Sequence, residues 1–186
     1  MIENEFKIML NKEQYEKLLG LYGFKTVVQV NHYYDTDDLE MSARHITVRV
    51  RELDGKFFFQ MKLPNDGALP SAGVSRVELS KELDRVPEIF AGFVLTAFSG
   101  VECPEVKHIG TLKTTRNIWE FDGGEIDLDR SEYFDRTDYE LEIEYTDEQA
   151  ARKMLSEVSE KLGISAGSEV CMGKIRRFLE EYKKRS

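Results

Sequence analysis

The stretch Ile2-Glu3-Asn4-Glu5-Phe6-Lys7-Ile8 has charged residues at alternating positions. Because successive side chains of a β-strand point to opposite faces, Glu3, Glu5 and Lys7 would share one face of a strand. The other face would be mostly apolar. A strand at the protein surface can have this pattern too, but the same alternation returns in most later strands. We therefore expect strands with one charged and one apolar face, whose charged faces close around a shared interior.

The alternation is densest in Glu140-Leu141-Glu142-Ile143-Glu144, which would place three carboxylates on one face of a strand. The same spacing occurs at Arg49 and Arg51, at Arg76 and Glu78, and at Asp127 and Asp129. The apolar faces of these strands and the apolar stripes of the predicted helices can be buried by packing against each other. If helices cover the outside of the sheet, the charged faces must look inward.

Turn and capping signals predict the other elements. Asn11, with Gln14 at the capping-box position, would begin a helix that ends near Gly20, and Asp147 would cap a helix that reaches about Leu162. Helical spacing predicts further helices over 87–98 and 172–182. The expected strands are 2–8, 26–34, 46–52, 56–63, 74–80, 107–121, 125–133 and 139–145. We expect one α+β domain, with an antiparallel sheet whose eight or so strands could close into a β-barrel.

Composition and charge exclude several classes of function. The 186 residues carry a formal net charge of -9, which argues against a general nucleic-acid-binding protein, because such proteins usually have a basic face. The N-terminus shows no export signal, and no apolar run is long enough to cross a membrane. Cys103 and Cys171 form no metal-binding or disulfide pattern, and the three histidines are scattered singly. We expect a cytoplasmic protein with reduced thiols.

A barrel interior filled with charge is costly unless the charges pair, bind metal or hold a charged ligand. The inward cations would be Lys7, Arg49, Arg51, Lys62, Arg76, Arg116 and Lys174. The inward carboxylates would be Glu3, Glu5, Glu78, Asp127, Glu142 and Glu144. Arginine and lysine suit phosphate, and carboxylates without histidine or cysteine suit Mg²⁺ or Mn²⁺. Both a metal-bound polyphosphate and a salt-bridge network without a ligand fit this pattern.

The motifs resemble those of a known family. Glu3-Asn4-Glu5-Phe6-Lys7 matches the Glu-x-Glu-x-Lys signature of the CYTH domains, also called triphosphate tunnel metalloenzymes. Later elements follow in the family's order, namely Tyr33-Tyr34-Asp35-Thr36, Arg49-x-Arg51, Lys62 before Leu63-Pro64, Arg76-x-Glu78, Arg116, Asp127-Leu128-Asp129, the Glu140–Glu144 strand and Lys174-Ile175-Arg176. The resemblance covers essentially all of residues 1–186 and is strongest to bacterial members of the kind found in Firmicutes. It implies a single CYTH-like domain with an eight-stranded antiparallel tunnel open at both ends, a polar charged interior and helices packed outside.

The resemblance also implies roles for individual residues. The residues that would bind the triphosphate substrate are Lys7, Arg49, Arg51, Lys62, Arg116 and Lys174, with Arg76 as an addition. The residues that would bind or orient Mg²⁺ or Mn²⁺ are Glu3, Glu5, Glu78, Asp127, Glu142 and Glu144. Catalysis would depend on Glu3, Glu5, Lys7, Glu142 and Glu144. Asp129 and Glu140 share the inward faces without an assigned role. One difference is Gly173, because relatives often have serine before the lysine that matches Lys174.

We expect a metal-dependent hydrolase of the triphosphate group, with inorganic triphosphate as the favoured substrate, because the sequence shows no clear nucleobase or thiazole pocket. Three alternatives remain, namely a class IV-like adenylyl cyclase, a thiamine triphosphatase and a non-catalytic polyphosphate-binding module. The expected partner is a triphosphate-containing small molecule, with no nucleic acid and no membrane. The expected oligomeric state is a monomer or a homodimer.

Overall fold

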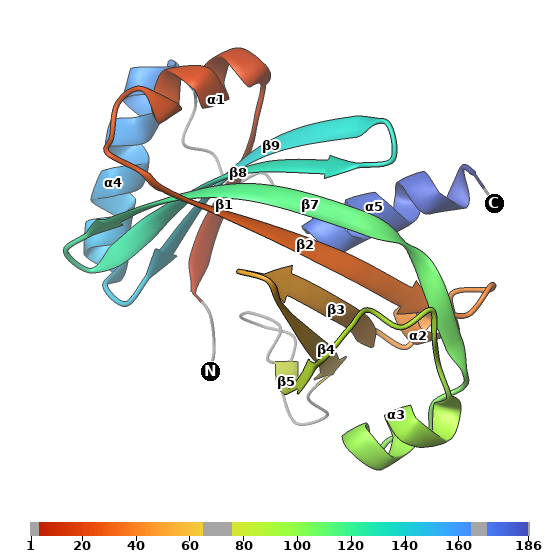
Figure 1. Cartoon of the computed structure of the whole chain (residues 1–186). Coiled ribbons are helices and arrows are strands. Elements are labelled where there is room, and N and C mark those ends of the chain that lie inside the picture. Colours follow the sequence, from red (N-terminus) through yellow and green to blue (C-terminus); the bar gives the residue numbers. More distant parts are fainter. Residues whose placement is uncertain (1–3, 65–75, 165–170, 186) are drawn as a thin grey trace. The chain divides into compact units, whose positions relative to one another are not determined.

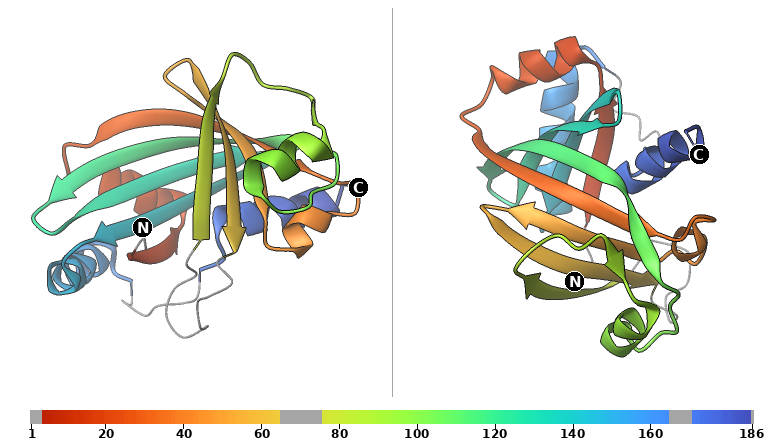
Figure 2. Two further views of the ribbon diagram at one scale, coloured as in Figure 1. Left: turned by 90° about the horizontal axis from the view of Figure 1, so that it is seen from below. Right: turned by 45° about the vertical axis from the view of Figure 1, so that its right-hand side comes forward.

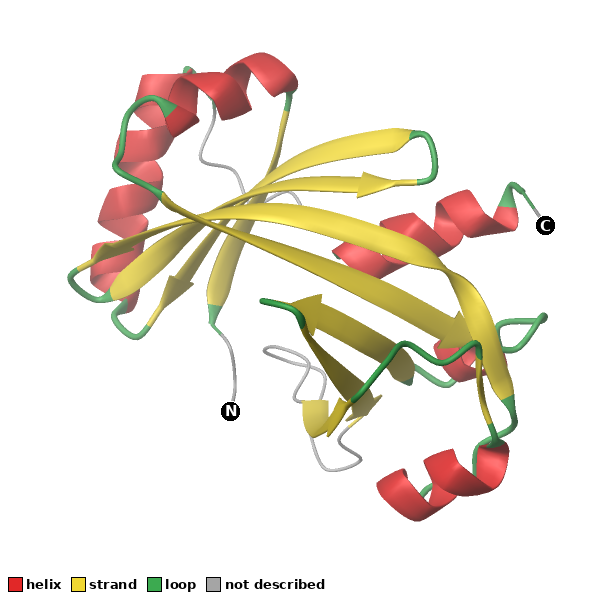
Figure 3. Ribbon diagram, viewed as in Figure 1, coloured by secondary structure: helices red, strands yellow, loops and turns green. Residues whose placement is uncertain are grey.

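The structure is a computed structural model that describes residues 4–64, 76–164 and 171–185, and within these it forms nine β-strands and five α-helices (Figures 1 and 3). The strands are β1 (Glu5–Leu10), β2 (Lys25–Asp35), β3 (Thr47–Leu53), β4 (Lys56–Pro64), β5 (Arg76–Leu83), β6 (Ile89–Phe90), β7 (Val106–Phe121), β8 (Gly124–Tyr133) and β9 (Arg136–Tyr145). The helices are α1 (Lys12–Leu19), α2 (Glu40–Ala43), α3 (Gly92–Ser99), α4 (Glu148–Leu162) and α5 (Lys174–Lys183). None of these helices is both long and apolar enough to cross a membrane.

The strands form one sheet in the order β1-β9-β8-β7-β2-β3-β4-β5, and β6 pairs with β7. Successive neighbours such as β8 and β9, or β3 and β4, are antiparallel (Figure 2). The predicted α+β fold with an antiparallel sheet is confirmed, and β6 is a short strand added to the eight expected. Within the described residues, the hydrogen-bonded order ends at β1 and at β5.

The chain divides into two compact units. One unit contains Gln29–Leu112, and the other contains Glu3–Val28 and Lys113–Ser186. For brevity, the first is called the central unit and the second the terminal unit. The prediction of a single domain, and of charged faces that share one interior, stays a prediction.

In the terminal unit, helices α1 and α4 cover the apolar face of β1, β8 and β9. The buried core contains Leu18 of α1, Val158 of α4 and the strand residues Ile126, Leu128, Leu141 and Ile143. Burial of each such side chain stabilises the fold by roughly 1.5–3 kcal/mol. Asn11 and Gln14 form the predicted capping box of α1, and Asp147 caps α4. This packing leaves the opposite face of the three strands for the charged residues.

In the central unit, helices α2 and α3 pack on the apolar face of β3 and β4. Met41 of α2 and Leu95 of α3 are fully buried with Val48, Val50 and Met61 of the strands. The alternation in β3 and β4 therefore works as predicted, because the valines enter the core while the arginines between them point to the other face.

Most predicted boundaries differ from the structure by a few residues, and strand pairing explains two of these differences. The helix expected over 87–98 begins only at Gly92, because Ile89 and Phe90 pair with Lys107 and Val106 of β7 as strand β6. The strand expected from Tyr139 begins at Arg136, because β8 and β9 continue to pair up to a tight turn at 134–135. In both places, pairing with a neighbouring strand overrides the helix or turn signal of the local sequence.

Candidate functional site

Strand register collects the charged residues of the terminal unit on one face. In the β1–β9 pair, Glu5 lies opposite Glu144 and Lys7 lies opposite Glu142. In the β8–β9 pair, Glu125, Asp127 and Asp129 lie opposite Glu144, Glu142 and Glu140, respectively. The alternate residues from Glu5 to Lys7, from Glu125 to Asp129 and from Glu140 to Glu144 thus form a continuous charged surface, which we call the terminal-unit face.

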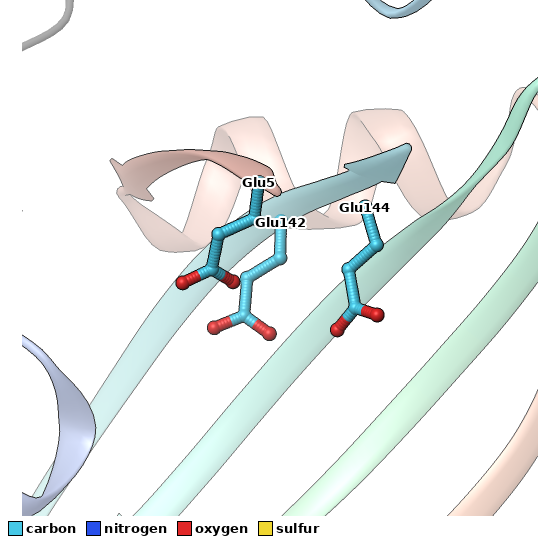
Figure 4. Close-up of side chains that lie close together, drawn as sticks. All are labelled: Glu5, Glu142 and Glu144. Carbon is cyan, nitrogen blue, oxygen red and sulfur yellow. The ribbon is translucent and has the colours of Figure 1, made fainter. Parts of the chain in front are cut away.

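Three carboxylates on this face converge. Glu5, Glu142 and Glu144 extend on the same side of β1 and β9 (Figure 4), and one carboxylate oxygen from each lies within 4.8 Å of the others. Glu125 and Asp127 form a second group of three with Glu144 at the same spacing. Glu144 therefore belongs to both groups and lies between them.

Two lysines share the carboxylate of Glu142. Its Oε1 lies 2.8 Å from Nζ of Lys7 and 2.6 Å from Nζ of Lys174. Lys174 also contacts Asp129 at 2.9 Å, so this ammonium group bridges β8 and β9. Although burial opposes ionisation, Lys174 and Lys7 hold the pKa of Glu142 well below its usual range. Glu142 is therefore a buried, ionised carboxylate held by cations.

Arg116 of β7 is the third cation on the face. Its Nε and Nη2 donate to the two carboxylate oxygens of Asp129 at 3.0 and 2.7 Å, which is a bidentate pair. The same Nη2 donates to Oε2 of Glu142 at 2.7 Å, and Nη1 forms an ion pair with Asp127. Despite its burial, the carboxylates raise the pKa of Arg116, so its charge is permanent.

Asp127 is the least satisfied carboxylate of the face. Its side chain is fully buried, and within the described residues neither of its oxygens accepts an aligned hydrogen bond, although one oxygen lies against Arg116. Burial raises the pKa of Asp127 to about 8, because the nearby Arg116 only partly offsets the cost of desolvation and Asp129 adds to it. Asp127 therefore gains from any further cation that reaches it.

The central unit carries its own charged face, which is mainly cationic. Arg49 of β3 is buried and donates from Nε to Gln60 at 2.8 Å, while Lys62 of β4 lies 2.8 Å from Glu78 of β5. Burial by itself would raise the pKa of Glu78, but Lys62 and Arg49 outweigh this effect and lower it. Arg51 donates to Asn31 at 3.1 Å. Three cations thus face one ionised carboxylate among the side chains described here.

This chain is similar to known proteins over almost its whole length. A family model described as the CYTH domain matches residues 1–172. The chain belongs to the CYTH family. It is 30% identical to a protein of Bacillus subtilis (strain 168) named "Putative triphosphatase YjbK", over 98% of this chain and 97% of the relative.

Solved structures show the CYTH fold as well. A Bacillus halodurans crystal structure described as a "putative adenylate cyclase" is 31% identical, with a TM-score of 0.70, and the match covers 95% of this chain and 97% of that one. The Hippeastrum protein HpAC1, described as having a dominant triphosphatase activity, has the same TM-score at 20% identity, with 97% and 96% of the two chains covered. The second likeness shows the fold alone.

The CYTH residues predicted from sequence fall into three sets. Those on the terminal-unit face are Glu5, Lys7, Arg116, Asp127, Glu142, Glu144 and Lys174, together with Asp129 and Glu140. Those on the central-unit face are Arg49, Arg51, Lys62 and Glu78. Glu3 and the side chain of Arg76 lie outside the described residues. The catalytic, substrate and metal roles of all these residues stay predictions.

Sequence reasoning missed several residues of the CYTH site. Glu125 joins the second acidic group, and it could have been found because it lies two residues before Asp127 on the same strand. Arg177 contacts Asp138 and Glu140, and its position three residues after Lys174 on a helix was the available signal. Gln60 gave no signal, because an amide between charged positions has no distinctive pattern.

The two acidic groups fit a divalent cation. All their donors are carboxylate oxygens, which hard ions such as Mg²⁺ and Mn²⁺ prefer. The buried oxygens of Asp127, without aligned hydrogen bonds in the described structure, are the clearest sign of a missing positive partner. Glu142 differs, because Lys7, Lys174 and Arg116 already surround it. A metal on Glu142 would have to share that carboxylate with these cations.

Proposed function

We propose that this CYTH protein is a divalent-metal-dependent triphosphatase whose favoured substrate is inorganic triphosphate. The observation that carries the proposal is the terminal-unit face, where Glu5, Glu142 and Glu144 converge beside the ammonium groups of Lys7 and Lys174. The name of the B. subtilis relative supports a reaction at a triphosphate group. Mg²⁺ or Mn²⁺ is the proposed metal.

The carboxylates of the face are the proposed metal ligands. Glu5, Glu142 and Glu144 would hold one ion, and Asp127 would contribute to a second with Glu144 and the newly recognised Glu125. When bound, such ions neutralise phosphate oxygens and make a bound water more acidic. Glu3 is proposed to add to the first set. No side-chain nucleophile is needed, because an ionised carboxylate can orient the attacking water by accepting its hydrogen bond.

The cations of the face would bind the phosphate chain. Lys7, Lys174 and Arg116 now pair with carboxylates, and phosphate oxygens are equivalent partners for the same hydrogen-bond donors. They would neutralise the charge that develops on the leaving phosphate, which is where positioned cations contribute most to phosphoryl transfer. In the central unit, we propose that Arg49, Arg51 and Lys62 also bind phosphate oxygens, with Arg76 as an addition, and that Glu78, which now pairs with Lys62, helps to bind or orient the metal.

A second candidate function is adenylyl cyclase activity, because a solved relative at 31% identity is described as a "putative adenylate cyclase". In that reaction the 3′-hydroxyl of ATP would replace water as the nucleophile and pyrophosphate would leave. Chromatographic detection of cyclic AMP separates the two reactions. Thiamine triphosphate belongs in the same substrate comparison, which is made on kcat/KM.

The test measures phosphate release from inorganic triphosphate with Mg²⁺ or Mn²⁺. We expect turnover by the wild type and a loss of about 100-fold or more in Glu5→Gln and Glu142→Gln, because each change removes a charged ligand from the reacting centre. Glu160→Gln is the matched control, since Glu160 lies on α4, the helix that covers the opposite, apolar face of these strands, and is exposed. It should keep its activity. No wild-type turnover with either metal, or full activity in both site variants, would overturn the proposal.

We also propose that the metal is Mg²⁺ or Mn²⁺ and that the protein is a monomer or a homodimer. It would have no nucleic-acid or membrane partner and would be located in the cytoplasm.

A further inference from the structure

Arg177 connects helix α5 to strand β9 through a single guanidinium group. Its Nε donates to Oδ2 of Asp138 at 2.8 Å, and its Nη2 forms an ion pair with Oε2 of Glu140. Its Nη1 donates to the backbone carbonyl of Met172, just before α5 begins. The side chain is only 12% exposed. One buried side chain thus fixes where the first turn of α5 lies on the terminal-unit face.

The N-terminus of α5 has no side-chain cap. The N-cap is Gly173, which has no side chain to accept a hydrogen bond from the first turn. Lys174 is the first helical residue, and Arg177 lies three residues later, so the two side chains share one side of the helix. The guanidinium contact to Met172 therefore helps to set the position of Lys174.

Glu140 links Arg177 to Lys174. Its carboxylate is almost completely buried, and its two oxygens have different partners. Oε2 binds Arg177, whereas Oε1 lies 3.2 Å from Nζ of Lys174 and 3.3 Å from Nζ of Lys7. Burial raises the pKa of Glu140, and Lys174 opposes this effect. If Arg177 were removed, Lys7 and Lys174 would be the near counter-ions left to the buried Glu140 among the residues that the structure describes.

Lys174 uses all of its hydrogen-bonding capacity in this network. An ammonium group has three protons, and Nζ of Lys174 lies within 3.2 Å of Asp129, Glu140 and Glu142. The contact with Glu140 is the longest of the three, as expected when Arg177 already neutralises that carboxylate. Without Arg177, Glu140 would hold Lys174 more tightly.

We propose that Arg177 is a positioning residue for anion binding, which acts by neutralising Glu140 so that Lys174 can move from carboxylates to phosphate oxygens. This inference rests on the proposed function, in which Lys174 binds the substrate. Arg177 itself need not touch the substrate, because each of its three side-chain nitrogens donates to Asp138, Met172 or Glu140.

The test is calorimetric binding of inorganic triphosphate in EDTA, where metal-dependent hydrolysis cannot occur. We expect Arg177→Gln to bind about 10-fold more weakly, the effect of losing roughly one charge-assisted interaction. Arg177→Lys should recover part of the loss, because an ammonium can neutralise Glu140 but cannot reach all three acceptors. The matched control is Arg176→Gln, since Arg176 is 74% exposed and pairs only loosely with Glu180. It should bind within twofold of the wild type.

A double-mutant cycle separates positioning from general structural damage. If Arg177 acts through Lys174, then adding Arg177→Gln to Lys174→Gln should weaken binding by less than about twofold more. Additive losses, or wild-type affinity in Arg177→Gln, would overturn the positioning role while leaving the proposed function intact. If wild-type protein binds no triphosphate even with Mg²⁺ or Mn²⁺ added, the proposed function fails and this inference fails with it. If Arg177→Gln does not fold, Arg177→Lys replaces it, both as the single variant and in the double-mutant cycle with Lys174→Gln.

Discussion

Replacement of Asp127 by asparagine should stabilise the metal-free protein. The pKa of this buried carboxyl group is raised from 3.8 to about 8 by burial, against the attraction of Arg116. At pH 7 the unfolded chain would be ionised at this position while the folded protein would be largely protonated, a difference that costs the fold about 4 kcal/mol. Asparagine has nearly the same shape and no charge. After allowance for the lost pair with Arg116, we expect a gain of about 1–3 kcal/mol in the free energy of unfolding.

The pH dependence of stability identifies the cause. Because the folded pKa of Asp127 is the higher one, its contribution to wild-type stability is fully present below about pH 4 and is lost as the pH rises towards 8. Urea unfolding in EDTA, followed by fluorescence of the single tryptophan Trp119, would be compared at pH 5 and pH 8. Asp127→Asn should gain more at pH 8 than at pH 5, and Glu160→Gln, a change at an exposed residue of α4, should show no such difference. An Asp127→Asn variant less stable than the wild type at pH 8, or one with an unchanged pH profile, would refute this reasoning.

Two further predictions concern stability and strand packing. Burial and the neighbouring His108 lower the pKa of His32, so on acidification the unfolded chain is protonated at this imidazole before the folded protein is. Wild-type stability should therefore decrease as the pH falls through about 6.5. In urea titrations at pH 7.5 and 5.5, His32→Gln should show a smaller decrease. A Cβ at Gly124 would lie 2.3 Å from the backbone oxygen of Glu144. Gly124→Ala should therefore cost about 2 kcal/mol in unfolding free energy and weaken Mn²⁺ binding by calorimetry, whereas Gly23→Ala, with open space around its Cβ, should do neither.

Strand alternation was enough to predict which side chains share a face. In β9, the residues between Glu140, Glu142 and Glu144 are Leu141 and Ile143, and both enter the core beneath α1 and α4. A shift of one residue in register would bury the carboxylates among apolar side chains. The cost of desolvating these charges therefore favours the observed register. The capping box at Asn11 was equally predictable, because it depends only on residues three positions apart.

Long-range placement could not be read from the same patterns. Nothing local to Lys174 indicates that its ammonium group lies among Asp129, Glu140 and Glu142, because those contacts depend on where α5 meets β8 and β9. The strand β6 was missed for a related reason, since Ile89 and Phe90 continue an apolar helical stripe until β7 offers them backbone partners. The raised pKa of Asp127 depends on burial, which a two-residue spacing does not reveal.

Opposite pKa shifts on adjacent carboxylates show how the terminal-unit face distributes its charge. Asp127 and Glu142 lie opposite each other in the β8–β9 register, yet the pKa of Asp127 is raised and that of Glu142 is lowered. Both are buried, so desolvation alone cannot separate them. The difference is the number of cations in the described part of the chain, where Glu142 contacts two lysines and Arg116 while Asp127 contacts Arg116. Of the two carboxylates, Asp127 is therefore the one whose ionised form a bound divalent cation would stabilise more.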